Sequence, residues 1–335
     1  MTVEFQARTE PFRRELLAHC YRMLGSFHDA EDLVQETYVR ALRGYAGFQG
    51  RSSVRVWLYR IATTACLDHL EGRRRRALPS GLGAPEHDHR VRLVPGAADV
   101  PWLGPAPDHR LGVGDDPADI VAARSGVRLA FVAALQLLPA RQRAVLILRD
   151  VLAWRAAEVA EVLSTTTVAV NSALRRARDT LAPVVADDLS EPPDPATRAV
   201  LDRYVTAFVR ADVDALVGLL RADVELEMPP IPTWFTGADA VGRFLAERAA
   251  LWPDRWLVRH TRANGGPALA MYVLDPGRHE YAAHGITLLS LLGGRVSRVV
   301  VFNDETLFPV FDLPVTEPAR AAARAASRAQ GEARR

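Results

Sequence analysis

The strongest limit on how this chain can fold is a helix-breaking stretch, residues 78–117, between two blocks of helical periodicity. Pro, Gly, His and Asp dominate that stretch, and no hydrophobic period is sustained across it. Residues 10–75 and 120–182 repeat apolar side chains at the i, i+3, i+4 spacing of amphipathic helices. Because Pro and Gly interrupt helices, the pattern predicts two all-α domains joined by a linker.

A second boundary follows at a cluster of prolines, Pro192, Pro193 and Pro195. Helical segments come first after it and mostly strand-like segments later, an order typical of an α+β domain. Strands are expected at 224–230 and near 256–262, 268–274, 281–290 and 295–302. The phrase "MPPIPTWFTG" is expected to be a loop, and the Ala/Arg tail a disordered segment.

The basic residues are distributed unevenly. The chain has a net charge of +2 and contains no Lys, so every cationic side chain other than His is an Arg. Arg favours bidentate contacts with phosphate and guanine. Between Arg51 and Arg76, Arg alternates with aromatic residues, a pattern that suits single-stranded nucleic acid. The alternative is that Trp57 belongs to a core and that the Arg run is a solvated helix end.

Residues 155–182 have the pattern of a helix-turn-helix. The segments "RAAEVAEVL" and "VAVNSALRRARDTL" are joined by a few residues, "STTT". Such a motif would direct Arg to guanine or phosphate, and Asn or Ser to base edges. The alternative is a plain pair of antiparallel helices.

The stretch "DAEDLVQETYVRAL", residues 29–42, predicts an amphipathic helix with four carboxylates in its first eight residues. Asp32, Gln35, Glu36 and Arg40 fall on its polar face. Taken alone, these acids are most simply a solvated surface.

Several functional classes are disfavoured. Cys20 and Cys66 are the only cysteines, so neither a disulfide framework nor a cysteine zinc site is expected. No metal or cofactor site is predicted. No apolar run reaches the roughly 20 residues of a membrane span, and the first residues lack a signal-peptide core, so we expect a cytoplasmic protein.

The motifs gain meaning from their order. Four segments resemble, in their order along the chain, domains two and four of bacterial extracytoplasmic-function (ECF) RNA polymerase sigma factors. They are "HDAEDLVQETYVRAL", "FQGRSSVRVWLYRIATTACLDHLEGRRRRAL", "LPARQRAVLILRDVLAWRAAEVAEVL" and "VNSALRRARDTL". The phrase "VPWLGPAPD" and the long C-terminal extension resemble the subgroup with a fused SnoaL-like domain, which includes the mycobacterial sigma factors G and J.

This resemblance implies a multidomain fold of two all-α sigma domains, the second with a helix-turn-helix, followed by an α+β SnoaL-like, nuclear-transport-factor-like cone. The implied divisions are sigma domain two at 8–77, a linker at 78–119, sigma domain four at 120–184, the SnoaL-like domain at 196–314 and a disordered tail at 315–335.

The resemblance also implies partners and contact residues. The partners would be promoter DNA and core RNA polymerase, at its β′ clamp helices and β flap. Polymerase contacts are expected from Asp32, Gln35, Glu36 and Arg40. Contacts to the minus-ten element are expected from Phe48, Arg51, Ser52, Trp57, Arg60, Thr63 and Thr64. Contacts to the minus-thirty-five element are expected from Thr166, Thr167, Asn171, Ser172, Arg175, Arg176 and Arg178.

Two positions depart from the family pattern. Thr63-Thr64 stands where the family often has Arg-Asn, and Asn171-Ser172-Ala173 where it often has Lys-Ser-Arg. The loss of basic groups would weaken phosphate contacts and alter base preference.

The C-terminal domain leaves its role open, because fold does not determine function. Candidate pocket residues are Glu227, Trp234, Tyr272, His284, Asn303 and Asp304. One hypothesis is regulation from within the chain, by packing against the sigma domains and the "VPWLGPAPD" linker. The alternative is a small-molecule sensor or enzyme attached to a DNA-binding regulator. For the whole chain, we predict a promoter-specificity subunit without chemistry of its own; a repressor-type regulator is the alternative.

Overall fold

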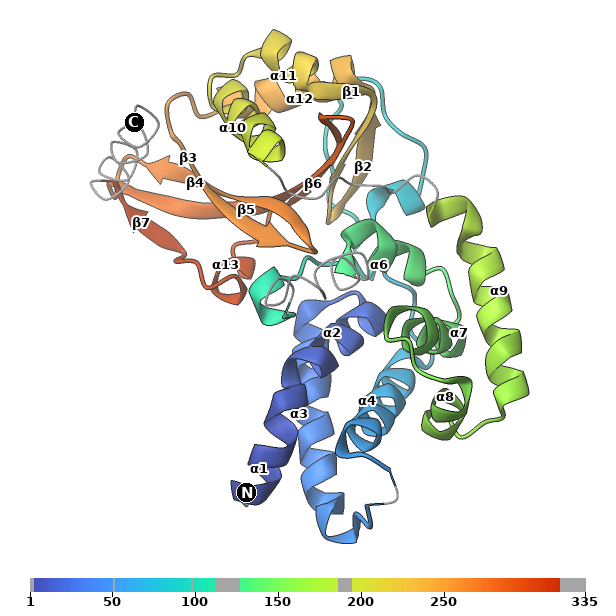
Figure 1. The fold of residues 1–335 in the computed structure, drawn as a ribbon. Coiled ribbons are helices and arrows are strands. Elements are labelled where there is room, and N and C mark those ends of the chain that lie inside the picture. The colour runs from blue at the N-terminus through green and yellow to red at the C-terminus, as the bar shows by residue number, and fades with distance from the viewer. Residues whose placement is uncertain (1–2, 51, 98, 113–126, 186–194, 320–335) are drawn as a thin grey trace. The chain divides into compact units, whose positions relative to one another are not determined.

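The computed structural model describes residues 3–50, 52–97, 99–112, 127–185 and 195–319 (Figure 1). The chain divides into two compact units, one of residues 1–77 with 98–189 and one of residues 78–97 with 190–335. The expected linker is therefore shared. Its first part, residues 78–97, belongs to the C-terminal unit, and the next described part belongs to the helical unit.

The first half of the helical unit contains α1 (Val3–Thr9), α2 (Arg13–Leu24), α3 (Phe27–Gly44) and α4 (Val54–Leu70). Gly25 ends α2 with a φ of 69°, as its sequence position predicts. A Cβ atom at Gly25 would come within 2.5 Å of Leu103 Cδ1, so a larger residue would also displace the Leu103 side chain. Ser26 begins α3 by accepting the Asp29 N–H on its hydroxyl.

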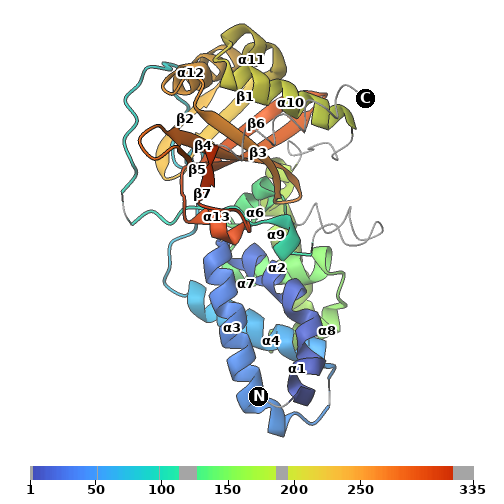
Figure 2. The ribbon, with the colours of Figure 1, turned by 90° about the vertical axis from the view of Figure 1, so that its left-hand side faces the viewer.

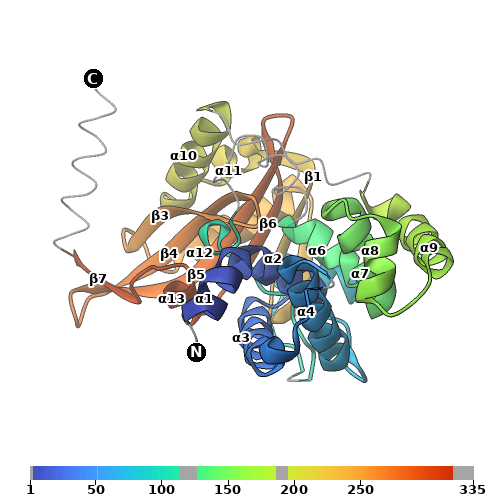
Figure 3. The same ribbon diagram turned by 60° about the horizontal axis from the view of Figure 1, so that its bottom comes forward.

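The second half contains α6 (Leu129–Leu135), α7 (Ala140–Leu146), α8 (Ala156–Val162) and α9 (Thr167–Val185). A π-helical turn, Ile147–Val151, follows α7. Figure 3 shows α4 beside α7 and α8, which places the two helical domains against each other within one unit. The linker segment "VPWLGPAPD", residues 100–108, lies in the same unit. There the N–H of Gly104 donates to the carbonyl of Gly25.

The C-terminal unit is a curved sheet with helices on its faces, as expected for an α+β domain. Its elements are α10 (Pro195–Val209), α11 (Val213–Leu219), β1 (Leu220–Met228), β2 (Ile231–Thr236), α12 (Ala238–Ala250), β3 (Trp256–Ala263), β4 (Gly266–Asp275), β5 (Glu280–Leu292), β6 (Arg295–Phe302), α13 (Leu307–Val310) and β7 (Thr316–Pro318). The strand order is β2-β1-β6-β5-β4-β3, and β7 pairs with β5. Helices α10 to α12 cover one face and α13 the other (Figure 2).

Two expectations for this unit are wrong. "MPPIPTWFTG" is not simply a loop, because Ile231–Thr236 forms β2, antiparallel to β1. Pro232 is tolerated there because β2 is an edge strand. The expected disordered tail begins with an ordered strand, β7, whose Glu317 forms an ion pair with Arg259. Residues 320–335 lie outside the described part of the chain.

Among the helices of the described residues, none combines the length and the apolar character needed to cross a bilayer.

Candidate nucleic-acid interface

The acidic residues of α3 fall into two groups with different surroundings. Asp29 and Glu31 have partners inside the helical unit: Arg76 and His69 contact Asp29, and Arg110 contacts Glu31. Asp32, Gln35 and Glu36 are exposed. Only the second group is positioned to meet another molecule.

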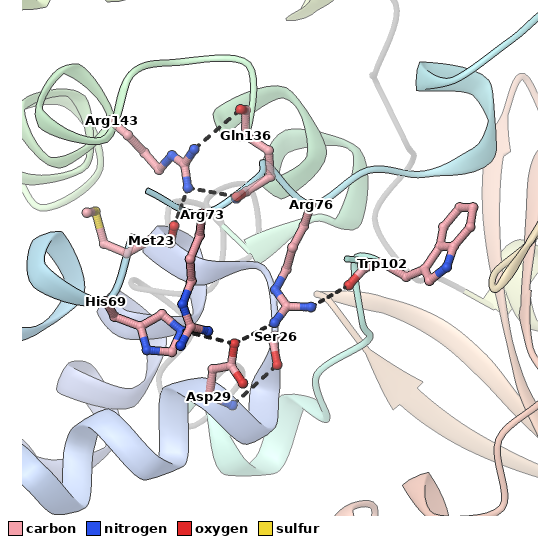
Figure 4. Close-up of polar contacts among 9 residues, drawn as sticks. All are labelled: Met23, Ser26, Asp29, His69, Arg73, Arg76, Trp102, Gln136 and Arg143. Carbon is pink, nitrogen blue, oxygen red and sulfur yellow. Dashed lines mark hydrogen bonds and ion pairs between the residues drawn. The ribbon is translucent and has the colours of Figure 1, made fainter. Parts of the chain in front are cut away.

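Asp29 is the centre of a polar cluster that connects three segments (Figure 4). Arg76, beyond the end of α4, donates one hydrogen bond to Asp29 and another to the carbonyl of Trp102 in the linker, at 2.9 Å. Burial favours a higher pKa for Asp29, but Arg76 and His69 outweigh it and hold the pKa below its usual value. Of the Arg run, Arg73, Arg74 and Arg76 thus each contact a partner within the chain: His69, Asp99 and Asp29.

Arg40, an expected polymerase contact, also bridges within the chain. Its guanidinium lies 2.6 Å from Glu36 and 3.5 Å from Asp68 of α4. All three side chains are substantially exposed, so these pairs contribute little to stability and leave the surface accessible.

The residues expected at the minus-ten element form an aromatic pair and a short exposed row. The rings of Phe48 and Trp57 lie 4.8 Å apart, and both are half-buried. Ser52 is half-buried near the start of α4, whereas Arg60 and Thr64 are exposed one turn apart. Arg51 lies outside the described residues.

Thr63 is a correction to the expected site. Its side chain is fully buried, and its hydroxyl lies 3.0 Å from Nε2 of the equally buried His19 on α2. Thr63 therefore belongs to the core between α2 and α4, where its side chain is not accessible to a base. Burial, aided by the nearby charge of Arg22, lowers the pKa of His19 to about 3, so this histidine is neutral at pH 7.

The predicted helix-turn-helix is formed by α8 and α9. Val159, Ala160 and Val170 are buried between them, and Thr166 begins α9 by accepting the Ala169 N–H at 3.2 Å. The expected DNA contacts Thr166, Thr167, Asn171, Arg175, Arg176 and Arg178 are exposed, and Ser172 is half-buried. Arg178 makes two hydrogen bonds to Asp150, at 2.7 and 2.9 Å.

Helix α4 and the helix-turn-helix lie against each other. Trp154, just before α8, packs its ring 4.9 Å from that of Tyr59 on α4, and Arg55 lies 5.4 Å from both rings. The Arg60 guanidinium is 3.4 Å from the hydroxyl of Ser164 in the turn before α9. The two candidate DNA-binding surfaces are thus in contact in this form of the chain.

A buried arginine strengthens this contact between domains. Arg143 of α7 donates to the carbonyl of Met23 and to both the carbonyl and the side chain of Gln136 (Figure 4). It also donates to the carbonyl of Leu138. Burial lowers the pKa of Arg143 to about 10. Sequence reasoning missed Trp154 and Arg143, because their helical pattern gives no sign of partners on α2 and α4.

The six expected C-terminal pocket residues lie on different elements and differ in burial and in their contacts. Glu227 is fully buried on β1 beside half-buried Trp234 of β2. Tyr272 contacts Phe308 of α13, whereas His284 packs between the rings of Trp252 and Trp256. Asn303 and Asp304 are exposed beyond β6. No group of three or more His, Cys, Asp or Glu side chains within the described residues could hold a metal ion.

Comparisons with known families and proteins match the order of these parts. Sigma-70 region 2 matches residues 9–76, sigma-70 region 4 matches residues 128–181, and the SnoaL-like domain matches residues 201–299. The ECF RNA polymerase sigma factor SigG of Mycobacterium tuberculosis is 52% identical over 319 residues, covering 93% of this chain and 84% of SigG.

A solved structure supports the same arrangement of domains. The crystal structure of the extracytoplasmic-function sigma factor SigJ of M. tuberculosis matches with a TM-score of 0.59 and 25% identity, covering 92% of this chain and 99% of that one. In sequence, SigJ is 31% identical over 243 residues, 70% of each protein. The chain therefore belongs to the ECF RNA polymerase sigma factors, with two helical sigma domains followed by a SnoaL-like domain.

Proposed function

We propose that this sigma factor presents the exposed face of α3 to the β′ clamp helices of core RNA polymerase and leaves promoter recognition to α4 and α9. The observation that carries this assignment is the division of acids on α3. Asp29 and Glu31 are half-buried and paired with Arg76 and Arg110, whereas Asp32 and Glu36 are exposed. Glu36 also pairs with Arg40, but at the surface. An acidic surface repels DNA, so a basic protein surface is its natural partner.

The minus-ten element would be held by the exposed row on α4 and by the Phe48–Trp57 pair. Aromatic faces stack on unpaired bases, which contributes about 1–3 kcal/mol per base. Arg60 and Thr64 lie along the same helix and would contact the backbone or base edges. The minus-thirty-five element would be held by the exposed side chains of α9, with sigma domain four also contacting the β flap.

The SnoaL-like domain would regulate activity from within the chain. This hypothesis is supported by the grouping of residues 78–97, which lie between sigma domains two and four in sequence, with the C-terminal unit. The alternative is that the domain is a small-molecule sensor or enzyme. Thermal-shift screening with small molecules, followed by turnover assays on any ligand found, tests that alternative.

Run-off transcription with core polymerase tests the proposed function. The full chain should produce promoter-specific transcripts from a genomic library, and deletion of residues 196–335 should change their level or promoter profile. Absence of specific product would contradict the proposed roles of α3, α4 and α9. An unchanged level and profile after the deletion would contradict regulation by the SnoaL-like domain.

A further inference from the structure

Residues 78–97 lie on the SnoaL-like domain as a bound peptide does. The N–H of Ser80 donates to the Glu227 carboxylate at 2.9 Å, and the indole N–H of Trp234 donates to the carbonyl of Gly83 at 2.8 Å. Further along, the N–H of Glu86 donates to the carbonyl of Trp234 at 2.7 Å, and that of Gly96 to Pro230 at 2.9 Å. On the linker side all four hydrogen bonds use backbone groups, as in the recognition of an extended peptide.

The edge of the sheet explains why a peptide binds at this position. Strand β2 is the last strand on one side of the sheet, and its outer backbone groups need a partner or a cover. Glu86 forms a parallel bridge with Phe235 of β2, and Val91 and Leu93 pack against the hydrophobic core of the domain. The linker therefore covers the outer edge of β2 and, through Val91 and Leu93, apolar surface of the domain core as well.

Glu227 gives the position its chemical selectivity. Its side chain is fully buried, and within the described residues its Oε2 atom has no hydrogen-bond partner. Arg298 lies 3.6 Å away but is hydrogen-bonded to Glu225. A buried carboxylate is costly unless donors satisfy it, so this position favours a ligand that brings an N–H group.

Backbone hydrogen bonds in the helical unit join the residues that flank the bound segment on either side. The N–H of Ala77 donates to Pro101, and the N–H of Leu103 donates back to Ala77. While this bridge stands, residues 78–101 add nothing to the separation of the two sigma domains. At about 3.3–3.6 Å per residue, the same residues would span about 80 Å if extended. Promoter elements centred near minus ten and minus thirty-five lie about 85 Å apart along B-DNA.

We propose that Glu227, Trp234 and strand β2 form a peptide-binding site whose ligand is the chain's own linker, residues 78–96. Release of the linker from this site, together with opening of the bridge from Ala77 to Pro101 and Leu103, supplies the length that the two sigma domains need to reach both promoter elements. This inference rests on the proposed regulatory role and names the segment through which it acts.

Hydrogen exchange on the full-length chain tests the binding site directly. Glu227→Leu removes the acceptor for Ser80 and keeps a side chain of similar size, while Trp234→Phe removes only the indole donor and keeps an aromatic ring. Both variants should speed exchange of the Ser80 and Glu86 amides by about fivefold or more, the effect of losing one net hydrogen bond. Glu225→Gln, which perturbs Arg298 without contacting the linker, is the matched control. Unchanged exchange in both folded variants overturns the site.

Run-off transcription by the same variants separates this inference from the proposed function. Faster exchange together with more promoter-specific transcript supports linker release as the regulatory step. Faster exchange with an unchanged transcript overturns the length argument, even if deletion of residues 196–335 alters transcription. Unchanged exchange with an effect of that deletion refutes the peptide site and leaves regulation by the domain standing.

Discussion

His19 shows how one buried polar side chain makes the stability of a domain depend on pH. In the folded chain its pKa is lowered to about 3, chiefly by burial, whereas an unfolded histidine titrates near 6.5. Below about pH 6.5 the unfolded state therefore binds a proton that the folded state does not. The free energy of unfolding should fall as pH drops from about 6.5 to about 3, by at most about 1.4 kcal/mol per pH unit from this residue.

Replacing His19 with Leu should flatten that pH profile. At pH 7 the variant should be about 1 kcal/mol less stable, because the Thr63 hydroxyl loses its partner. At pH 5 the loss should shrink or reverse, because the variant has no imidazole to protonate on unfolding. Urea unfolding of sigma domain two at both pH values measures this. The exposed His28→Leu is the control, and equal pH slopes for wild type and His19→Leu would falsify the argument.

Residue types and spacing predict which residues belong to the candidate interface better than they predict the contacts of those residues within the chain. The polar face of α3 is visible in the sequence, but the pairing of Asp29 with Arg76 depends on a residue 47 positions away. Thr63 could be placed in the minus-ten helix by its neighbours, yet its burial depends on packing against α2. Helical periodicity predicts which side of a helix a residue faces, but only the tertiary structure shows which residues it contacts on that side.

At the scale of single elements, α3 allows a direct test of polymerase binding. Reversing the charge at Asp32 and Glu36, with Asp32→Lys and Glu36→Lys, should weaken binding of core polymerase about tenfold or more, with the effect greatest at low salt. The fold should persist because both side chains are exposed and the lost Glu36–Arg40 pair is a surface one. Fluorescence anisotropy of labelled chain with core polymerase measures the affinity. The control is Glu305→Lys, at an exposed site beyond β6, which makes the same change in charge per residue. If Glu305→Lys lowered the affinity for core polymerase equally, a specific α3 contact would be contradicted.

Helix α9 offers a matched pair of arginines. Arg175 is exposed and forms no ion pair within the described residues, whereas Arg178 is already bonded to Asp150. Arg175→Ala should weaken duplex DNA binding and reduce the slope of log affinity against log salt by about 1, as for one lost phosphate contact. Arg178→Ala should do less. Anisotropy titrations across a salt series check this, and identical slopes in all three proteins would remove Arg175 from the interface.

Elements also show where sequence patterns lose their power. Periodicity and turn residues are sufficient to predict that α2 ends at Gly25 and that the long strands of the sheet form. Strand β2 was missed because its proline argues against a strand, and only its position at the sheet edge removes the conflict. Strand β7 was missed because three residues are too few to establish a period.

At the scale of the whole molecule, the described form of the helical unit is closed. Trp154 joins the helix-turn-helix side to α4, and Arg143 joins α7 to the end of α2. Helices in contact cannot also contact two promoter elements about 85 Å apart. If α4 and α9 bind the two elements as we propose, the sigma domains must separate first. A sequence could not reveal this, because the contacts join segments about 100 residues apart.

Trp154→Ala should shift the chain toward the open form. The ring is buried with its indole nitrogen unpartnered within the described residues, so its removal loses packing and no hydrogen bond. Losing a buried tryptophan costs about 3–5 kcal/mol of contact, which is large beside the few kcal/mol that separate typical conformational states. Small-angle scattering of the free chain should show a larger radius of gyration, while circular dichroism keeps its helical signal. Trp57→Ala removes an equal ring that packs on Phe48 within sigma domain two, so it should leave the radius unchanged. A radius that responds to neither variant, or equally to both, would mean that the Trp154 contact does not hold the domains together.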